Sequence, residues 1–346
     1  MFGNVMAIER VLGTGIIISS SKPIPQGVEQ RIHAFVEEYE RTLSRFRADS
    51  LVSRMARAEH GGEFEFPAWT QPLFVLYDEF YVATRGAFDA CIGADLLALG
   101  YDNSVKFVPK SKAGEGKDEN ISSGSWSKYR RSLPITWADI SRDSGSATLH
   151  TNQPVQLDFG AAGKGYFVDL VTNILKDELG DDSLSDCDFL VNAGGDMRAC
   201  FSDEDYQIKV ALENPFDTTQ AVGVASIASG ALCASSAARK RWKVKDANCL
   251  ADNAFESNLI ATHLINALDG VPSQKLSASW AYIPAKTCAF PTAYADALAT
   301  ALFVSQENDL QKIVQTAGAE FVVMLPNRAD CQVRATSAFP ARFFAD

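Results

Sequence analysis

The sequence predicts an α+β fold built as one large globular unit over residues 1–346. A chain of this length can form two average domains or one large unit with a substantial core. Hydrophobic residues make up 47% of the chain and charged residues 22%, a composition typical of a folded protein. From residue 132 onward, runs of short strand patterns are separated by only a few helical patterns, whereas a doubly wound α/β chain alternates strand and helix regularly.

The first third of the chain predicts a strand followed by two helices. Residues 11–19 are rich in β-branched side chains and are followed by turn-forming residues, which predicts a strand. Residues 27–43 carry apolar side chains at helical spacing, and we expect this helix to end near Ser44. The apolar positions from Pro72 to Thr84 predict a buried helix that ends at Arg85–Gly86.

A long polar segment separates these elements from the rest of the chain. Residues 103–131 are rich in Ser, Gly and Lys and have no apolar periodicity, so we expect a flexible loop insertion at the surface. Later helical patterns cover Lys164–Glu178 and Ala293–Gln306. Short strands are expected at Ile135–Trp137, Ala147–Leu149, Phe189–Val191, Tyr206–Leu212 and Val222–Ile227.

The charge balance limits the classes of partner. A formal net charge of −11 argues against nucleic-acid binding, since contacts to phosphates need clustered Lys and Arg. An acidic protein that binds a phosphate-bearing ligand must gather its cations locally or use a metal ion, so we expect a divalent metal. No stretch reaches the ~20 apolar residues that cross a bilayer, and the N-terminus lacks the features of a signal peptide. We therefore expect a cytoplasmic protein without a membrane segment, unless a leader was removed.

The segment Asp158–Asp169 (DFGAAGKGYFVD) has the setting of a phosphate-binding turn between a strand and a helix. It is not a P-loop, because Asp158 occupies the position six before Lys164, where a glycine is required, and Gly165 follows the lysine. The small residues around Ala161 would let backbone groups approach a ligand or metal closely. The alternative is an ordinary tight turn with a surface lysine.

Two later segments are also ambiguous when taken singly. Leu190–Ala199 (LVNAGGDMRA) ends a strand pattern in a glycine pair, and its turn chemistry favours a structural corner. Thr292–Val304 is rich in alanine and predicts a helix with Thr292 as its N-cap. Asp296 and Thr300 are four apart on that helix, so their oxygens share one face and form half of a Mg²⁺ site that a pyrophosphate could complete. The alternative is a cap-region Asp with a Thr that bonds back to a helix carbonyl.

His263 is a candidate general base. It lies between apolar neighbours and the turn at Gly270–Pro272, and it is one of only four histidines. A histidine with an ordinary pKa near 6.5 can accept a proton from a hydroxyl at neutral pH. A buried structural histidine is the alternative.

The order of these segments along the chain resembles the ApbE family of FAD:protein FMN transferases. The resemblance covers nearly the whole chain. Its motifs are Leu12–Thr14 (LGT), Leu43–Ser50 (LSRFRADS), Thr84–Leu96 (TRGAFDACIGADL), Leu157–Asp169, Leu190–Ala199, Ala234–Trp242 (ASSAARKRW), His263–Pro272 and Thr292–Val304.

The resemblance implies a fold, a reaction and a set of site residues. It implies an ApbE-like fold with mixed or antiparallel sheets, and transfer of FMN from FAD to a Ser or Thr hydroxyl of an acceptor protein, with release of AMP. It implies Mg²⁺ bound by Asp296, Thr300 and the main-chain carbonyl of Ala161, with His263 as the base. The implied FAD contacts are Leu12, Phe46, Ala87, Phe88, Asp89, Asp158, Lys164 and Leu264. The acceptor would carry an FMN-binding domain, as in a reductase or an electron-transfer subunit.

Some positions depart from the family pattern. The family's His-Ile-Ile-Asp-Pro-x-Thr-Gly segment lacks its proline and threonine here, and an insertion separates Trp242 from His263. The departing residues are Asn266, Ala267 and Asp269, together with Ser235, Ser236 and Ala237 where the family has Thr-Ser-Gly. These departures keep open the alternative of a non-catalytic FAD-binding protein. A second alternative is an FAD pyrophosphatase that gives FMN and AMP, because the same site could use water in place of the acceptor hydroxyl.

Overall fold

The computed structural model describes residues 2–107, 126, 135–143, 145–179, 187–244, 259–326 and 332–344. Most of the predicted loop 103–131 lies outside the described residues, as does much of the insertion between Trp242 and His263. The expected flexibility of that loop therefore stays a prediction.

An eight-stranded sheet forms the centre of the molecule, and every pair of neighbouring strands in it is antiparallel. Some neighbouring strands follow one another directly in the chain, and others are joined by long connections. Strands from the two halves of the sequence therefore lie side by side. In spatial order the strands are β1 (Asn4–Glu9), β2 (Gly15–Ser20), β6 (Phe189–Ala193), β7 (Asp196–Cys200), β10 (Gly230–Ser236), β15 (Ala278–Pro284), β16 (Glu320–Met324) and β17 (Val333–Ala335).

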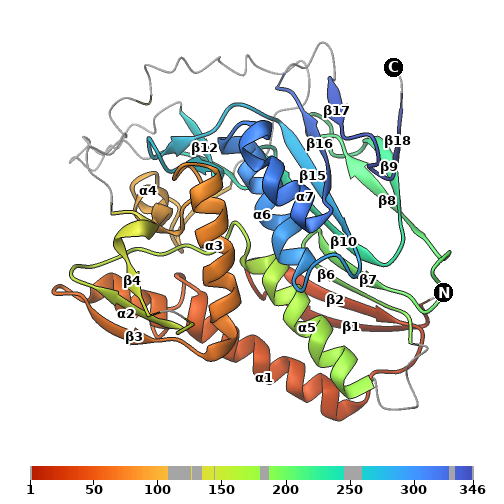
Figure 1. The fold of residues 1–346 in the computed structure, drawn as a ribbon, viewed down its shortest axis with the longest axis horizontal. Helices are drawn as coiled ribbons and strands as arrows, with labels where there is room; N and C mark the ends of the chain where they lie inside the picture. Colours follow the sequence, from red (N-terminus) through yellow and green to blue (C-terminus); the bar gives the residue numbers. More distant parts are fainter. Residues whose placement is uncertain are drawn as a thin grey trace.

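Helices cover one face of this sheet and a second sheet covers part of the other (Figure 1). Helix α6 (Pro291–Val304) packs against β10 and β15, and α5 (Gly163–Leu179) packs against α6 and β7. Both helices bury apolar side chains that join the main core cluster. On the opposite face, β8 (Ile208–Glu213), β9 (Ala221–Ile227) and β18 (Ala341–Phe343) form a three-stranded sheet over a smaller core that includes Trp280.

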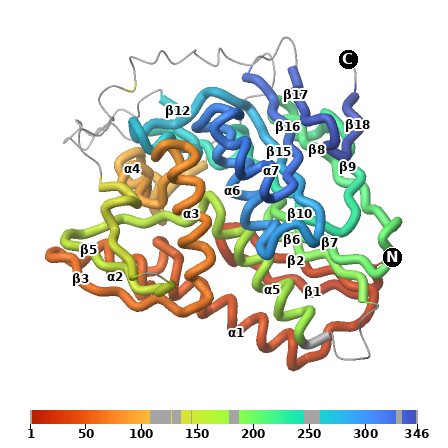
Figure 2. Tube along the Cα trace, in the orientation of Figure 1, coloured from red at the N-terminus to blue at the C-terminus, as the bar shows by residue number. Residues whose placement is uncertain are grey.

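The other elements surround this framework. They are α1 (Gln26–Leu43), α2 (Leu51–Arg57), β3 (Gly62–Glu65), α3 (Gln71–Ala83), α4 (Gly93–Ala98), β4 (Ser141–Arg142), β5 (Thr148–Thr151), β11 (Arg241–Lys243), β12 (Ile260–Thr262), β13 (Ile265–Asn266), β14 (Val271–Pro272) and α7 (Gln311–Ala317). Of these, α2, β3, β4 and β5 lie together on one side of α3 (Figure 1 and Figure 2). No helix within the described ranges is long and apolar enough to cross a membrane.

The α+β prediction is confirmed, and so are its main elements. The four predicted helices correspond to α1, α3, α5 and α6, and α1 is followed by Ser44 as its C-cap. After α3, both Arg85 and Gly86 adopt a positive φ, as expected of a helix end. Predicted strands after residue 146 correspond to β5, β6, β8 and β9.

Three details of the prediction were wrong. The strand expected over residues 11–19 begins only at Gly15, because Leu12 and Gly13 adopt positive φ and turn the chain between β1 and β2. Ile135–Trp137 is not a strand, because Thr136 and Asp139 form a capping box that starts a short 3-10 helix at Trp137. Thr292 is not the N-cap of α6: Phe290 holds that position and Pro291 begins the helix.

Candidate functional site

A cavity of about 1000 Å³ lies where the central sheet, α5 and α6 meet the turns that flank them. Its size suits a nucleotide-sized ligand. The structure brings all of the predicted site residues to its wall, although they come from distant parts of the chain. They are Leu12, Phe46, Ala87, Phe88, Asp89, Asp158, Ala161, Lys164, His263, Leu264, Asp296 and Thr300.

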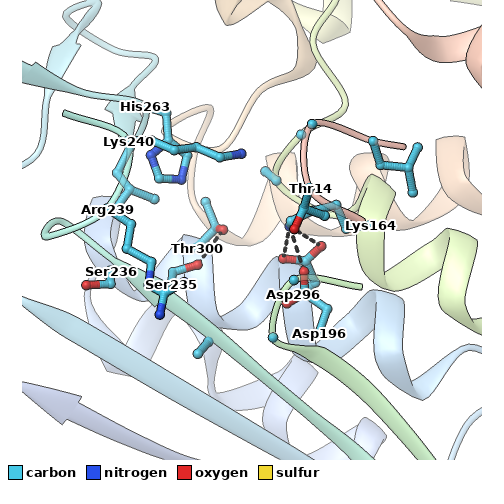
Figure 3. A pocket seen from close by; sticks show the side chains of 18 of the residues that line it. Thr14, Lys164, Asp196, Ser235, Ser236, Arg239, Lys240, His263, Asp296 and Thr300 are labelled. Atoms are coloured by element: carbon cyan, nitrogen blue, oxygen red, sulfur yellow. Dashed lines mark hydrogen bonds and ion pairs between the residues drawn. The ribbon is translucent and has the colours of Figure 1, made fainter. Parts of the chain in front are cut away.

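Lys164 lies between two buried carboxylates (Figure 3). Its Nζ is 2.7 Å from Asp196 Oδ2 and 3.3 Å from both carboxylate oxygens of Asp296. Burial opposes the lysine charge, but Asp196 and Asp296 outweigh it and raise the pKa of Lys164 above its ordinary value. Burial, followed by the negative charge of Asp196, also raises the pKa of Asp296, because the longer contact with Lys164 offsets only part of that cost. The cluster therefore holds one cation between two anions and favours a further positive charge.

Gly165 brings α5 close enough to α6 to form this cluster. A Cβ at this position would lie 2.2 Å from the carbonyl oxygen of Thr292 and 2.8 Å from Asp296 Cβ, so only glycine fits. The Gly165 N–H donates to Asp296 Oδ2 at 3.0 Å. In a regular helix that N–H would donate to the carbonyl of Ala161, four residues earlier. The Ala161 carbonyl at the cavity wall is therefore left available to a ligand.

Further oxygen atoms converge near Asp296. Thr300 lies one turn later on α6, and its Oγ1 is 3.1 Å from Ser235 Oγ on β10. Asp196 Oδ1 is buried and has no hydrogen-bond partner in the part of the chain that the structure describes. Within those same residues, no group of three or more His, Cys, Asp or Glu side chains forms a metal site. A metal here would therefore use carboxylate, hydroxyl and main-chain oxygens, the donor set that suits Mg²⁺ rather than Zn²⁺.

His263 lies across the cavity from Lys164, beside Lys240 (Figure 3). Its Nδ1 is buried and has no hydrogen-bond partner among the described residues. Burial lowers the pKa of His263 well below its ordinary value, and the positive charges of Lys240 and Lys164 lower it further. The ring is therefore neutral at pH 7 and has a nitrogen available to accept a proton.

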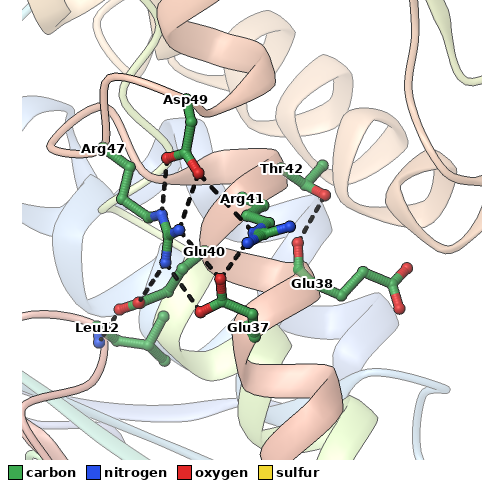
Figure 4. Close-up of polar contacts among 8 residues, drawn as sticks. All are labelled: Leu12, Glu37, Glu38, Glu40, Arg41, Thr42, Arg47 and Asp49. Atoms are coloured by element: carbon green, nitrogen blue, oxygen red, sulfur yellow. Dashed lines mark hydrogen bonds and ion pairs between the residues drawn. The ribbon is translucent and has the colours of Figure 1, made fainter.

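The Leu12 turn is fixed by a network of charged residues on α1 and in the segment that follows this helix (Figure 4). The Leu12 N–H donates to Glu40 Oε1 at 3.0 Å, and Glu40 lies 3.9 Å from Arg47 Nη1. Arg47 also pairs with Glu37 and with Asp49. This network helps to hold Leu12 at a φ of 53°, a conformation that a leucine rarely adopts.

Phe46 and Asp158 are joined through Arg45. The Arg45 guanidinium lies 4.2 Å from the centre of the Phe46 ring, and its Nε donates to Asp158 Oδ2. The ring of Tyr101 packs edge-on against Phe46, with ring centres 5.6 Å apart, and its centre lies 4.8 Å from the same guanidinium. Phe46 remains 39% exposed at the cavity wall, so a planar ligand can stack on it.

Asp89 has a structural role in addition to its place at the wall. Its Oδ1 accepts from the Cys91 N–H at 2.7 Å, and its Oδ2 accepts from the Trp137 N–H at 3.1 Å. These bonds position the segment that carries Ala87 and Phe88. Together with Leu264, those two residues give this part of the cavity a buried apolar surface.

Comparison with known proteins identifies the family. The model of the ApbE family matches residues 12–323. The chain belongs to the ApbE family. An ApbE protein from Thermotoga maritima aligns with a TM-score of 0.70 at 19% identity, covering 97% of this chain and 98% of that one. No curated protein matches the sequence.

Solved structures named as flavin transferases share the fold of this ApbE-family chain. The flavin transferase ApbE from Vibrio cholerae aligns with a TM-score of 0.69 at 17% identity, and the alignment covers 97% of each chain. The flavinyl transferase ApbE from Pseudomonas stutzeri, in its apo form, aligns at 0.67 and 20% identity, covering 98% and 96%. The antiparallel central sheet with helices on one face is therefore part of the ApbE fold.

Some cavity residues of the ApbE-family chain were missed by reasoning from sequence. Asp196 was interpreted as part of a structural corner, yet its carboxylate is the nearer partner of Lys164. The glycine pair before Asp196 was the available signal of a special turn. Gly194 has a φ of 65°, and a Cβ at this position would lie 2.6 Å from Thr14 Oγ1. Ser235, which had been noted only as a departure from the family pattern, also lines the cavity. Lys240 lines it too, within a motif that had been noted only as a whole.

Proposed function

We propose that this chain transfers FMN from FAD to a Ser or Thr hydroxyl of an acceptor protein in a Mg²⁺-dependent reaction that releases AMP. The observation that carries the proposal is the convergence of Asp296, Thr300 and the Ala161 carbonyl on one wall of a nucleotide-sized cavity, with the free Nδ1 of His263 across from them. Membership of the ApbE family supports it, since two structures that share the fold are named flavin or flavinyl transferases.

The metal-binding residues in this proposal are Asp296, Thr300 and Ala161. All three offer hard oxygen atoms, and Mg²⁺ favours one or two carboxylates completed by water and substrate phosphates. When bound, Mg²⁺ supplies positive charge that stabilises the pyrophosphate and the departing AMP. Lys164 contacts both oxygens of the Asp296 carboxylate, and the Gly165 N–H also donates to Oδ2, so these two residues position the carboxylate.

The remaining residues position FAD and move a proton. Leu12, Phe46, Ala87, Phe88 and Leu264 form the apolar wall for the flavin, with Asp89 and Asp158 at its edges. The acceptor hydroxyl gives its proton to His263, and its oxygen forms a bond to the phosphorus on the FMN side. The bond from that phosphorus to the bridging oxygen breaks, and AMP leaves with the bridging oxygen. General-base assistance of this kind contributes typically ~10²–10⁴-fold to a rate.

The acceptor in this proposal carries an FMN-binding domain, in a reductase or in an electron-transfer subunit. A second function follows if water replaces the acceptor hydroxyl, because the free Nδ1 of His263 can accept a proton from either nucleophile. The products would then be FMN and AMP, and the chain would be an FAD pyrophosphatase.

Chromatography of AMP and FMN tests the metal and carboxylate roles. We expect wild-type protein to release AMP from FAD with Mg²⁺ and acceptor present, and EDTA to abolish the release. Asp296→Ala removes a carboxylate that is 2% exposed at the wall and should reduce AMP release by at least roughly 100-fold. Asp203→Ala, at an exposed carboxylate in the loop before β8, should leave the rate unchanged.

The same assay separates the rival functions. AMP release that depends on the acceptor supports the transferase. Equal amounts of free FMN and AMP with and without acceptor would identify a pyrophosphatase instead. FAD that binds but is never cleaved would contradict both enzymatic functions and leave a non-catalytic FAD-binding protein.

A further inference from the structure

Lys240 occupies the turn between β10 and β11 and lines the cavity beside His263 (Figure 3). Its side chain extends into the same space that Lys164 borders from the other side. No hydrogen bond or ion pair joins the Lys240 ammonium to any residue in the ranges that the structure describes. A half-buried ammonium in such a position favours an anionic ligand.

Two other basic residues at the cavity wall, Lys164 and Arg239, differ in this respect. The Lys164 ammonium is held between Asp196 and Asp296, and Arg239 pairs with Glu213 through its Nε at 3.1 Å. Burial lowers the pKa of Lys240, and the charge of Lys164 adds to this, while more distant carboxylates oppose it. Burial removes water from the Lys240 ammonium, and no close partner in the described part of the protein offsets this cost. An anion that enters with the substrate would therefore stabilise the charged ammonium more than it would stabilise a lysine that is already paired.

The backbone at Lys240 is a second, independent observation. Its φ is 47°, in the left-handed region that normally favours glycine. Non-glycine residues in this region concentrate at ligand sites, where the surrounding structure maintains the strain. Within the described residues, three of the five non-glycine residues with positive φ line this cavity, namely Arg10, Leu12 and Lys240. The turn therefore maintains an unfavourable backbone conformation at a residue that directs a cation into the cavity.

We propose that the Lys240 ammonium binds a phosphate oxygen of the FAD pyrophosphate, on the His263 side of the cavity and across from Lys164 and Asp296. The identity of the ligand rests on the proposed function. In this arrangement one phosphate of the pyrophosphate lies toward the proposed metal ligands Asp296 and Thr300 on α6. Lys240 binds the other phosphate. A phosphate at Lys240 would also offset the positive charge that acts on His263.

Ligand titrations with the full chain test this role without relying on turnover. We would measure the affinity for FAD and for riboflavin, which has the same ring system but no phosphate, in EDTA and in Mg²⁺. Lys240→Met should weaken FAD binding by roughly 10- to 100-fold, the usual effect of losing a hydrogen bond to a charged group. Riboflavin affinity should change less than about twofold, because no phosphate contact is lost. Lys240→Arg should keep most of the FAD affinity.

Lys286→Met is the matched control. Lys286 also has a positive φ, of 71°, but its side chain is 85% exposed and pairs with Glu204 outside the cavity. The Lys286→Met variant should bind FAD and riboflavin with the same affinities as wild type. Unchanged FAD affinity in Lys240→Met would overturn the proposal, and so would an equal loss of FAD and riboflavin affinity, which indicates a structural role. If wild-type protein shows the expected FAD affinity and Lys240 dependence but never forms AMP, the proposed function fails while the Lys240 site stands.

Discussion

At the scale of single residues, the surroundings of His263 determine its protonation state. An ordinary histidine is half protonated near pH 6.5, and a protonated ring cannot act as a base. Burial and the neighbouring Lys240 and Lys164 lower the pKa of His263, so the neutral ring persists as the pH falls through 6.5. Loss of the base form is therefore expected only at a lower pH than for a solvent-exposed histidine.

NMR titration of the histidine ring signals tests this expectation. The chain has four histidines, so the His263 signal can be assigned by its absence in His263→Asn, with exposed His33 on α1 as an internal reference. We expect the His263 ring to stay neutral at pH 6.5 and its midpoint to rise in Lys240→Met, because one of the two repelling charges is gone. A wild-type midpoint at or above 6.5 would contradict this account of the site.

At the scale of elements, α6 depends on α5 for its N-terminal cap. Phe290 provides no side-chain cap among the described residues, and Asp169 of α5 accepts from Thr292 Oγ1 at 2.6 Å and from the Ala293 N–H at 2.9 Å. Burial raises the pKa of Asp169 to about 6, although Thr292, Arg198 and the Ala293 N–H oppose the shift. The contact that orients the helix carrying Asp296 and Thr300 therefore depends on pH.

The sign of this dependence follows from proton linkage. Because the folded protein holds the Asp169 proton more tightly than the unfolded chain, its contribution to stability is fully present below pH ~4 and is lost as the pH rises through about 6. A shift of this size corresponds to a loss of order 3 kcal/mol. Asp169→Asn keeps a neutral side chain at every pH and should remove this component from the pH dependence of unfolding.

Urea unfolding between pH 4 and pH 7 measures the effect. The free energy of unfolding of Asp169→Asn, relative to wild type, should increase over this range. Asp177→Asn, an exposed site on the same helix, is the control and should follow wild type. A constant difference between Asp169→Asn and wild type at all pH values would show that Asp169 does not titrate in this window.

The same elements show which local features can be predicted from sequence. The helical spacing of apolar residues placed α1, α3, α5 and α6 close to their observed bounds, because this spacing is a local property. The N-cap of α6 could not be predicted in this way, since its acceptor Asp169 comes from another helix far earlier in the chain. The strand predicted over residues 11–19 failed for a different reason: the β-branched run was real, but the turn at Leu12 divides it from β1.

At the scale of the whole molecule, the site is assembled from segments that are distant in sequence. The antiparallel order of the sheet places β6–β7, which carries Asp196, next to β10, which carries Ser235, and α6 packs across them. Sequence motifs identified Lys164, Asp296, Thr300 and His263 individually, and the family resemblance predicted that they act together. The glycine pair marked the turn before Asp196, but the role of Asp196 depends on its distance to Lys164, which no motif gives. Lys240 could not be assigned from a motif, because its role depends on its place at the cavity wall and on the lack of a partner among the described residues.

The most direct test of the central claim is the intact mass of an acceptor. A purified FMN-binding domain of an electron-transfer protein would be incubated with this chain, FAD and Mg²⁺, with Asp296→Ala and Asp203→Ala as paired variants. The account predicts that wild type and Asp203→Ala add one phosphoester-linked FMN to a Ser or Thr of the acceptor, and that Asp296→Ala and EDTA-treated samples add none. Release of AMP without any gain in acceptor mass, across several FMN-binding domains, would contradict the transferase.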